Sequence, residues 1–426
     1  MSEPVSTDPY KGVRDFYPDQ WARLEALFAS LRDTLVLWGY EEYNASPLER
    51  AELYEAKTSE EIVNEQTYTF TDRGERRVTL RPEMTPSLAR MVAAKRRELV
   101  FPLRWFSIGN RFRYERPQKG RLREFYQADI DLIGLPEGEA DIEVLRLAYK
   151  LLINLGATEN DFIIRINSRP LLNAACEAAG LTGESIRRYI HLLDKKTKMT
   201  PETFASTSRA LTPEDPLTFI ENSGKSTKVA NEKRKILDLI DTLKARGVKN
   251  ITLDTGITRG FDYYTGIVFE IFDTNPANPR SIIGGGRYDK LVALFSAKGD
   301  VDQIPAVGFG IGDVTLTDFV DTHALALNTK IGKPQLYLGT PSASDIPAAQ
   351  EFADTIRKQG GRVFVNLTDR SLGDQVRDAL KRGIPLFIAY GPQEVANNML
   401  RMKILSTGEE VGLPINELPA RLLSGS

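Results

Sequence analysis

The chain has 426 residues, 41% hydrophobic and 27% charged, a composition typical of a soluble globular protein with more than one hydrophobic core. Its 56 basic and 58 acidic residues nearly cancel, so any nucleic-acid contact must come from a local basic patch rather than from the net charge. One cysteine and two histidines exclude a disulfide scaffold, a cysteine-based zinc site and a multi-histidine metal centre, and they disfavour a Ser-His-Asp mechanism.

No segment of the sequence predicts a membrane span or a secretory signal. The apolar runs are shorter than the roughly 18 residues that cross a bilayer, and the first residues, MSEPVS, lack the basic and apolar regions of a signal peptide. We therefore expect a cytoplasmic protein that makes no membrane contact. The single cysteine, Cys176, falls in the apolar run LLNAACEAAG, which favours a buried helical thiol without a chemical role.

The N-terminal part of the chain predicts a helix, a hairpin and a second helix. Apolar residues recur at helical spacing over residues 20–38, which predicts an amphipathic helix. The segment TYTFTDRGERRVTLR at 67–81 has the pattern of a β-hairpin with its turn at DRG. In TLRPEMTPS, which follows, Thr85 is expected as a helix N-cap and Pro86 at the first helical position.

A second strand pair, residues 105–134, is the most informative segment. Strict alternation places Phe125, Gln127, Asp129 and Asp131 on one strand face. A row of polar side chains on one face of a central strand is typical of a cavity lining.

Beyond this pair, helices are expected from about 139 to 248, and strands return in ITLDTG, DYYTGIVFEIF, SIIGGGRYD and AVGFGIG. Long antiparallel strands with helices packed to one side indicate an α+β domain. The organisation changes near residue 323, where HALALNTKIGKP has the composition of a linker. Strands and helices then alternate, which favours βαβ crossovers and a separate, mostly parallel α/β domain of about a hundred residues.

Six cationic side chains within thirteen residues could bind phosphate or a nucleic-acid backbone. They are Arg111, Arg113, Arg116, Lys119, Arg121 and Arg123. A guanidinium held on a strand can grip a phosphate bidentately. On charge alone a solvated basic hairpin is an equally good interpretation, but the adjacent polar row at Gln127, Asp129 and Asp131 favours a binding site.

Three other segments are also consistent with a binding site, although their patterns are less specific. Glu83 is a carboxylate at a strand end that helix capping does not explain. Arg259 stands close to a tyrosine pair, Tyr263 and Tyr264, although such a pair in a strand more often belongs to a core. The glycines at 284–286 and at 308, 310 and 312 could open the backbone to a ligand, but bulges and tight packing use glycine too.

Together these blocks resemble the class II aminoacyl-tRNA synthetases, and within them the histidyl-tRNA synthetase family. KGVRDFYP, SPLE, RPEMT, FRYERPQKGRLREFYQ, RGFDYYTGIVFE and GGGRYD follow that family's order over roughly residues 10–312. The resemblance implies an α+β catalytic domain, 1–325, with a class II antiparallel sheet, flanking helices and a helical insertion at about 170–240. It also implies an α/β anticodon-binding domain at 333–426.

The resemblance implies that histidine is activated with ATP to histidyl-adenylate and then transferred to the 3′ end of tRNA(His). Arg113 and Arg259 are then the catalytic residues, one on each side of the α-phosphate. The expected ATP-binding residues are Arg113, Glu115, Arg121 and Arg259; the histidine-binding residues are Glu83, Met84, Thr85, Gln127, Asp131, Tyr263 and Tyr264; and the tRNA-binding residues are Arg116, Gln118, Lys119 and Arg123. Mg²⁺ is expected to accompany ATP, with no metal site built by the protein, and the chain is expected to form a homodimer through its 20–49 segment.

One departure from the family pattern concerns ATP. The family's third block usually ends in a Gly-x-Glu-Arg-like sequence, whereas GFGIGD here places Asp313, Val314 and Thr315 at those positions. The expected arginine is missing, and Arg287 is equally open to interpretation as its substitute or as a structural residue.

Two rival functions remain open at this stage. The first is the non-catalytic, histidine-sensing regulatory subunit of ATP phosphoribosyltransferase, which the missing arginine favours. The RPQKGRLREF loop and the C-terminal domain argue against that subunit. The second is a plain tRNA-binding module, which the polar row at Gln127, Asp129 and Asp131 disfavours.

Overall fold

The structure, a computed structural model, divides the chain into two compact units. The described residues are 5–55, 66–196, 199–259, 263–295, 303–327, 329 and 332–423. The first unit is Met1–Leu327 and the second is Asn328–Ser426, and each has a hydrophobic core of its own. No described helix combines the length and apolar character that crossing a bilayer requires.

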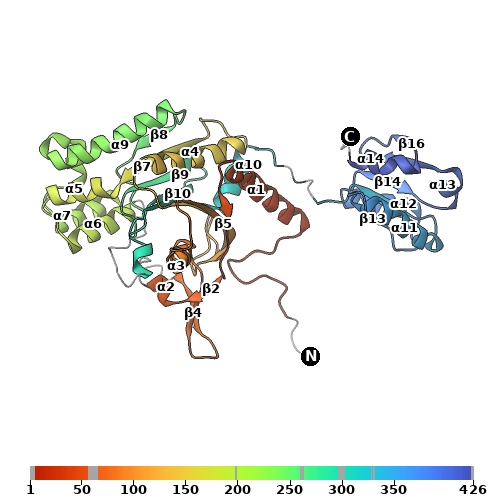
Figure 1. The fold of residues 1–426 in the computed structure, drawn as a ribbon, viewed down its shortest axis with the longest axis horizontal. Coiled ribbons are helices and arrows are strands. Elements are labelled where there is room, and N and C mark those ends of the chain that lie inside the picture. The colour runs from red at the N-terminus through yellow and green to blue at the C-terminus, as the bar shows by residue number, and fades with distance from the viewer. Residues whose placement is uncertain are drawn as a thin grey trace. The chain divides into compact units, whose positions relative to one another are not determined.

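A large sheet of eight strands organises the first unit (Figure 1). In sheet order the strands are β1 (Glu41–Glu42), β5 (Leu103–Phe112), β6 (Glu124–Ile133), β11 (Ala306–Gly312), β10 (Ser281–Arg287), β9 (Ile267–Asp273), β7 (Phe162–Ser168) and β8 (Ile251–Leu253). Among these strands, the two outermost pairs are parallel and the five inner pairs are antiparallel. The predicted α+β class is therefore confirmed.

Helices cover one face of this sheet, where alternate strand residues are apolar. The helices are α1 (Pro18–Leu37), α4 (Glu139–Asn154), α9 (Thr227–Ala245) and α10 (Asp313–Thr322). Leucines buried at helical spacing in α1 are Leu24, Leu27, Leu31 and Leu35, which confirms the predicted amphipathic helix. On β6, Ala128, Ile130 and Leu132 belong to the same core, so the intervening polar residues point to the opposite face.

A three-stranded sheet and three further helices also belong to the first unit. The strands, in order, are β2 (Leu48–Arg50), β4 (Arg77–Leu80) and β3 (Tyr68–Thr71), and the helices are α2 (Glu52–Glu55), α3 (Thr85–Lys95) and the 3₁₀ helix η4 (Val292–Phe295). Strands β3 and β4 form the hairpin predicted at 67–81. The predicted N-cap is wrong by one residue, because Met84 occupies that position and Thr85 is the first residue of α3.

Between β7 and β8 the chain forms a helical subdomain with its own core. Its members before α9 are α5 (Arg169–Ala178), α6 (Glu184–Asp194), α7 (Pro201–Leu211), α8 (Pro216–Glu221) and the 3₁₀ helix η3 (Ser223–Lys225). Cys176 is fully buried in this core with Leu172 and Tyr189, as the apolar run around it indicates. Burial raises the pKa of the thiol to about 12, so it stays protonated and unreactive.

The sequence analysis missed β7, which lies inside the region expected to be helical. Its residues FIIRINS form a short apolar run, and periodicity alone cannot distinguish such a run from a buried helical segment. Antiparallel pairing with β9 from Phe162 to Ser168 decides the conformation. The strand carries the sheet outward to the helical subdomain.

The second unit is a mixed α/β domain. Its sheet order is β13 (Val363–Val365), β12 (Leu336–Gly339), β14 (Leu386–Ala389), β15 (Met399–Ile404) and β16 (Glu410–Pro414). Its helices are η6 (Ala343–Asp345), α11 (Ile346–Arg357), α12 (Leu372–Lys381), α13 (Pro392–Asn397), η7 (Ile415–Glu417) and α14 (Leu418–Leu423). The first three strands are parallel, but β14, β15 and β16 pair antiparallel, so the prediction of a mostly parallel sheet is wrong for this C-terminal hairpin.

Candidate active site

The polar face of the large sheet forms the floor of a cavity of about 1290 Å³. Gln127, Asp129 and Asp131 of β6 line it, which confirms that this row of polar residues borders a cavity. Glycines on β11 make room for these side chains. A Cβ at Gly308 would lie 2.2 Å from Asp131 Oδ1, and a Cβ at Gly310 would lie 2.6 Å from Gln127 Nε2. The glycine run is therefore required by the close approach of side chains across the floor.

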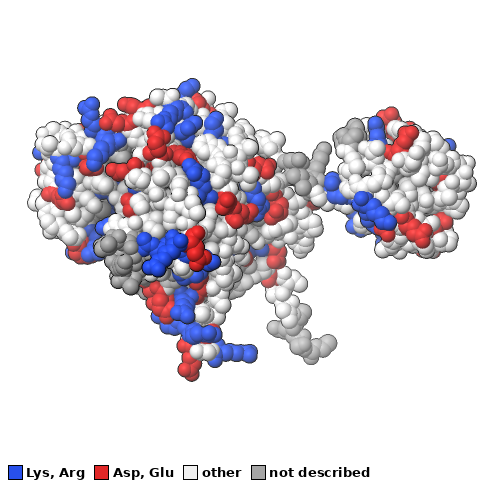
Figure 2. Space-filling model, viewed as in Figure 1, with Lys and Arg blue, Asp and Glu red and all other residues white. Residues whose placement is uncertain are grey.

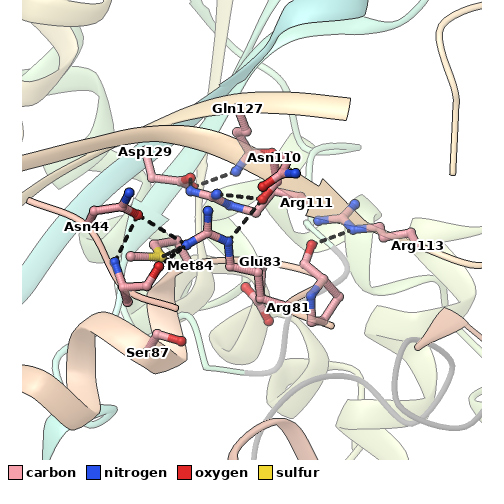
Figure 3. A network of polar contacts seen from close by, with 12 residues as sticks. Asn44, Arg81, Glu83, Met84, Ser87, Asn110, Arg111, Arg113, Gln127 and Asp129 are labelled. Carbon is pink, nitrogen blue, oxygen red and sulfur yellow. Dashed lines mark hydrogen bonds and ion pairs between the residues drawn. The ribbon is translucent and has the colours of Figure 1, made fainter. Parts of the chain in front are cut away.

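Arg111 is buried and does not line the cavity. Its guanidinium donates to Asp129 Oδ2 at 2.6 Å and to the Asn110 carbonyl at 2.9 Å (Figure 3). Gln127 Nε2 donates to the other oxygen of Asp129. Grouping Arg111 with the phosphate-binding cations is therefore wrong, because its role is to neutralise a buried carboxylate under the site.

Asp131 is a buried carboxyl whose two oxygens differ. Its Oδ1 accepts a hydrogen bond from the Tyr288 hydroxyl, whereas its buried Oδ2 has no partner among the described residues. Burial is the main cause that raises the pKa of Asp131 from 3.8 to about 8; the charge of Asp129 adds to it and the Tyr288 hydrogen bond opposes it. At neutral pH the carboxyl group of the ligand-free protein is therefore protonated, and its Oδ2, buried without a partner at the edge of the cavity, is available to donate to a ligand nitrogen or, once ionised, to accept from a ligand N–H. The sequence analysis did not identify Tyr288, although it directly follows the GGGR run.

Glu83 and the tyrosine pair meet although 180 positions separate Glu83 from Tyr263. The Tyr263 hydroxyl donates to Glu83 Oε2 at 2.9 Å, and the Tyr263 and Tyr264 ring centroids lie 4.9 Å apart. Burial raises the pKa of both tyrosines, so both hydroxyls remain protonated at neutral pH. Glu83, Thr85, Tyr263 and Tyr264 line the cavity, whereas the side chain of Met84 is fully buried outside the lining.

Arg113 and Arg259 enter the same cavity from different elements. The Arg113 guanidinium lies over the ring of Phe125, 5.3 Å from its centroid. Arg259 adopts a left-handed backbone conformation, with φ 58°, and donates to Glu270 Oε1 at 2.8 Å. Burial disfavours its charge, but Tyr264 and Glu270 more than offset this and raise the pKa of Arg259. A strained non-glycine residue held by an ion pair is a fixed cation at the cavity wall.

The loop between β5 and β6 divides its polar side chains between the cavity and the solvent. Glu115 and Arg121 line the cavity and form an ion pair at 3.1 Å. Arg116, Gln118 and Lys119 are exposed and lie outside the lining.

On the face drawn in Figure 2, basic and acidic side chains are interspersed, as the near-zero net charge leads one to expect.

Arg123 packs against the N-terminal segment. Its Nη1 donates to the Tyr10 hydroxyl at 3.0 Å, and its guanidinium lies 4.1 Å from the centroid of Tyr114. Its Nε donates to the carbonyl of Glu115 at 3.2 Å. These contacts give Arg123 a role in ordering the loop against residues 10–12, which the sequence analysis did not anticipate.

The third block contributes no arginine to the cavity. Val314 and Thr315 line the cavity at that position, and both are uncharged. Asp313 is buried, where its Oδ2 pairs with Arg14 at 2.6 Å and its Oδ1 accepts the Tyr126 backbone N–H at 2.9 Å. Val314 and Thr315 therefore bring no positive charge to this side of the cavity, and Asp313 is a structural anion.

Arg287 does not replace the missing arginine. It is buried, and its guanidinium donates to Asp141 at 2.9 Å and to Asp289 at 2.9 Å. Two backbone carbonyls, those of Leu135 and Pro136, accept its remaining hydrogen bonds at 3.1 Å. Arg287 is a structural residue, so its interpretation as an ATP ligand is wrong.

Two family models match the chain. A family model described as histidyl-tRNA synthetase matches residues 12–313. The chain belongs to the histidyl-tRNA synthetase family. A second model, described as an anticodon binding domain, matches residues 335–424, which lie in the second compact unit.

Curated relatives support the assignment over nearly the full length. The histidine–tRNA ligase of Leptospira biflexa is 37% identical, over 97% of this chain and 96% of the relative. That of Opitutus terrae is 38% identical over 96% of both chains, and that of Halobacterium salinarum is 34% identical over 97% of both.

Solved structures share the fold. The histidyl-tRNA synthetase of Nostoc sp. PCC 7120 superposes with a TM-score of 0.77 at 22% identity and covers 99% of this chain and 100% of its own. A Bacillus halodurans C structure titled as an ATP phosphoribosyltransferase regulatory subunit/histidyl-tRNA synthetase gives a TM-score of 0.72 at 24% identity, covering 91% of this chain and 99% of its own. At these identities the similarity concerns the class II fold.

Proposed function

We propose that the chain activates L-histidine with ATP to histidyl-adenylate and transfers the histidine to the 3′ end of tRNA(His). The observation that carries this proposal is the unpartnered, buried Oδ2 of Asp131 beside the cavity. An imidazole nitrogen, which accepts a hydrogen bond when bare and donates one when protonated, is a partner of matching chemistry. Full-length curated relatives named histidine–tRNA ligase support the same function and favour charging over the regulatory-subunit alternative.

Histidine would bind through its two polar ends. Glu83, Thr85 and Gln127 would hold the ammonium group, and Asp131 and Tyr264 would each take one imidazole nitrogen. A neutral imidazole has one donor and one acceptor nitrogen, so a carboxyl group and a phenol can satisfy both. An apolar analogue would leave these buried groups unpaired, which supports selection for histidine without an editing site.

The first step needs positioned charge rather than a nucleophilic side chain. A histidine carboxylate oxygen forms a bond to the α-phosphorus of ATP, while the bond to the bridging oxygen breaks and pyrophosphate leaves. Arg113 and Arg259 would stabilise the charge that develops on the α-phosphate, one from each side. Glu115 and Arg121 would contribute to the rest of the ATP site.

Mg²⁺ would enter as part of the nucleotide substrate, held mainly by the phosphates. In the described part of the chain, no group of three or more His, Cys, Asp or Glu residues is arranged as a metal site. Carboxylates that line the cavity, such as Glu115 and Glu270, could still complete the coordination of a nucleotide-bound ion.

In the second step the tRNA 3′ end would attack the adenylate carbonyl and release AMP. Exposed Arg116, Gln118 and Lys119 could meet the acceptor end, with Arg123 ordering the loop that carries them. The second unit would bind the anticodon, where unstacked bases present their edges.

We also propose a cytoplasmic homodimer. The 20–49 segment would form part of the interface. Val36 and Leu37, at the end of α1, are 64% and 82% exposed, and such an apolar surface supports a partner contact there.

Pyrophosphate exchange into ATP tests the proposal. The purified protein should catalyse exchange with histidine and with no other amino acid. Absence of exchange in a folded protein that still binds histidine would instead support the regulatory subunit. Binding of tRNA without binding of histidine or ATP would support a plain tRNA-binding module.

A further inference from the structure

Arg280, which precedes β10, is held against the tip of the loop between β5 and β6. Its Nε donates to the Lys119 carbonyl at 3.0 Å, and the Lys119 ammonium donates in return to the Ala277 carbonyl at 3.0 Å. Gly120 has φ +74°, and a Cβ there would lie 2.5 Å from Arg280 Cδ. The loop and the β9–β10 connection thus contact each other closely at this point.

The charge around Arg280 is not balanced. Arg280 lines the cavity with Arg121, and burial together with the charge of Arg121 lowers the pKa of Arg280. Glu115 is the carboxylate that opposes this effect, but it already pairs with Arg121 at 3.1 Å. In the described structure the two terminal nitrogens of Arg280 form no hydrogen bond or ion pair.

Three other arginines of the cavity are paired with carboxylates. Arg121, Arg165 and Arg259 each have a carboxylate partner, at 3.1, 3.3 and 2.8 Å. Arg280 is bound only through Nε and a backbone oxygen, so its terminal N–H groups remain available. Two adjacent guanidiniums that share one carboxylate form a site in which a multiply charged anion would relieve their repulsion.

We propose that Arg280 is a polyphosphate-binding residue that, with Arg121, binds the β- and γ-phosphates of ATP and the departing pyrophosphate. The inference rests on the proposed function and adds a residue to it. Bond cleavage leaves negative charge on the pyrophosphate, and a guanidinium placed there stabilises that charge. Val314 and Thr315 line the third-block side of the cavity and carry no charge. Arg280, directly before β10, supplies a cation to the same cavity from a different part of the chain.

The test compares Arg280→Ala and Arg280→Lys with the wild-type protein. Histidine-dependent exchange should give an ATP KM and a pyrophosphate KM that are at least about 10-fold higher in Arg280→Ala, because a charge-assisted contact is lost. Arg280→Lys should recover part of this loss. The dissociation constant for histidine, measured by calorimetry, should stay within about two-fold, which also reports that the site is folded. Arg165→Gln removes a cation from the same cavity that already has a carboxylate partner, and it should leave both phosphate constants near wild type.

Wild-type constants for ATP and pyrophosphate in Arg280→Ala would overturn the inference. Equal weakening of histidine and ATP would also overturn it, since that result indicates a structural role. If the wild-type protein catalyses no histidine-dependent exchange, that result contradicts the proposed function and leaves no KM values to compare. Calorimetric binding of inorganic pyrophosphate to wild type and Arg280→Ala then still decides the role of Arg280.

Discussion

Asp131 and Tyr288 form a buried pair in which the tyrosine hydroxyl occupies one carboxyl oxygen and leaves the other without a partner in the described structure. Asp131→Ala should therefore weaken histidine binding by about 10- to 100-fold, because an imidazole nitrogen loses its hydrogen-bond partner. Tyr288→Phe should weaken it less, since Oδ2 remains. Calorimetric titration with histidine measures both effects, and an unchanged affinity in Asp131→Ala would contradict the assignment of Asp131 to the imidazole.

The raised pKa of Asp131 predicts a pH dependence of stability. The folded protein keeps the Asp131 proton up to about pH 8, whereas the unfolded chain releases it near the ordinary value of 3.8. The folded state therefore binds more protons in this window, and the free energy of unfolding contributed by Asp131 falls as the pH rises from about 4 to about 8. Urea unfolding of the wild-type protein and of Asp131→Asn, between about pH 5 and pH 8, measures the difference. Parallel pH profiles would show that Asp131 ionises normally.

Gly308→Ala should disturb histidine binding by crowding the floor of the cavity. The new Cβ would lie 2.2 Å from Asp131 Oδ1 and 2.6 Å from the Ile130 carbonyl, so the Asp131 side chain and the adjacent backbone of β6 must move. We expect the histidine affinity to fall at least about 10-fold, since a displaced acceptor forfeits its hydrogen bond. Gly224→Ala is the matched control, because a Cβ there meets nothing within 4 Å. Equal affinities in the two variants would argue against a rigid cavity floor.

The sequence predicts features that depend on local periodicity. The period of two along β6 assigned Gln127, Asp129 and Asp131 to one face, and the structure confirms that this face borders the cavity. The same local reasoning does not separate Arg111, near the end of β5, from Arg113, which directly follows the strand. Their difference arises because Asp129 on the neighbouring strand pairs with Arg111.

Features that depend on distant parts of the chain were not predictable in this way. Tyr288 meets Asp131 across 157 positions, and Arg280 meets Lys119 across 161. Neither contact leaves a periodic signal, because both result from the order of strands in the sheet. The sequence alone does not decide between an ATP-binding and a structural role for Arg287 for the same reason, since its partner Asp141 lies 146 positions away.

Glu270 should act as a positioning residue for Arg259. Arg259 has a left-handed backbone, which costs about 1–3 kcal/mol, and its guanidinium is oriented by Glu270 Oε1 at 2.8 Å. In Glu270→Ala the exchange kcat should fall about 10- to 100-fold while the histidine dissociation constant changes little, because the cation is no longer fixed where charge develops. Glu270→Gln retains an acceptor oxygen and should recover part of the rate. Adding Glu270→Ala to Arg259→Ala should cost little more than Arg259→Ala alone, and an additive loss would mean that Glu270 acts independently of Arg259.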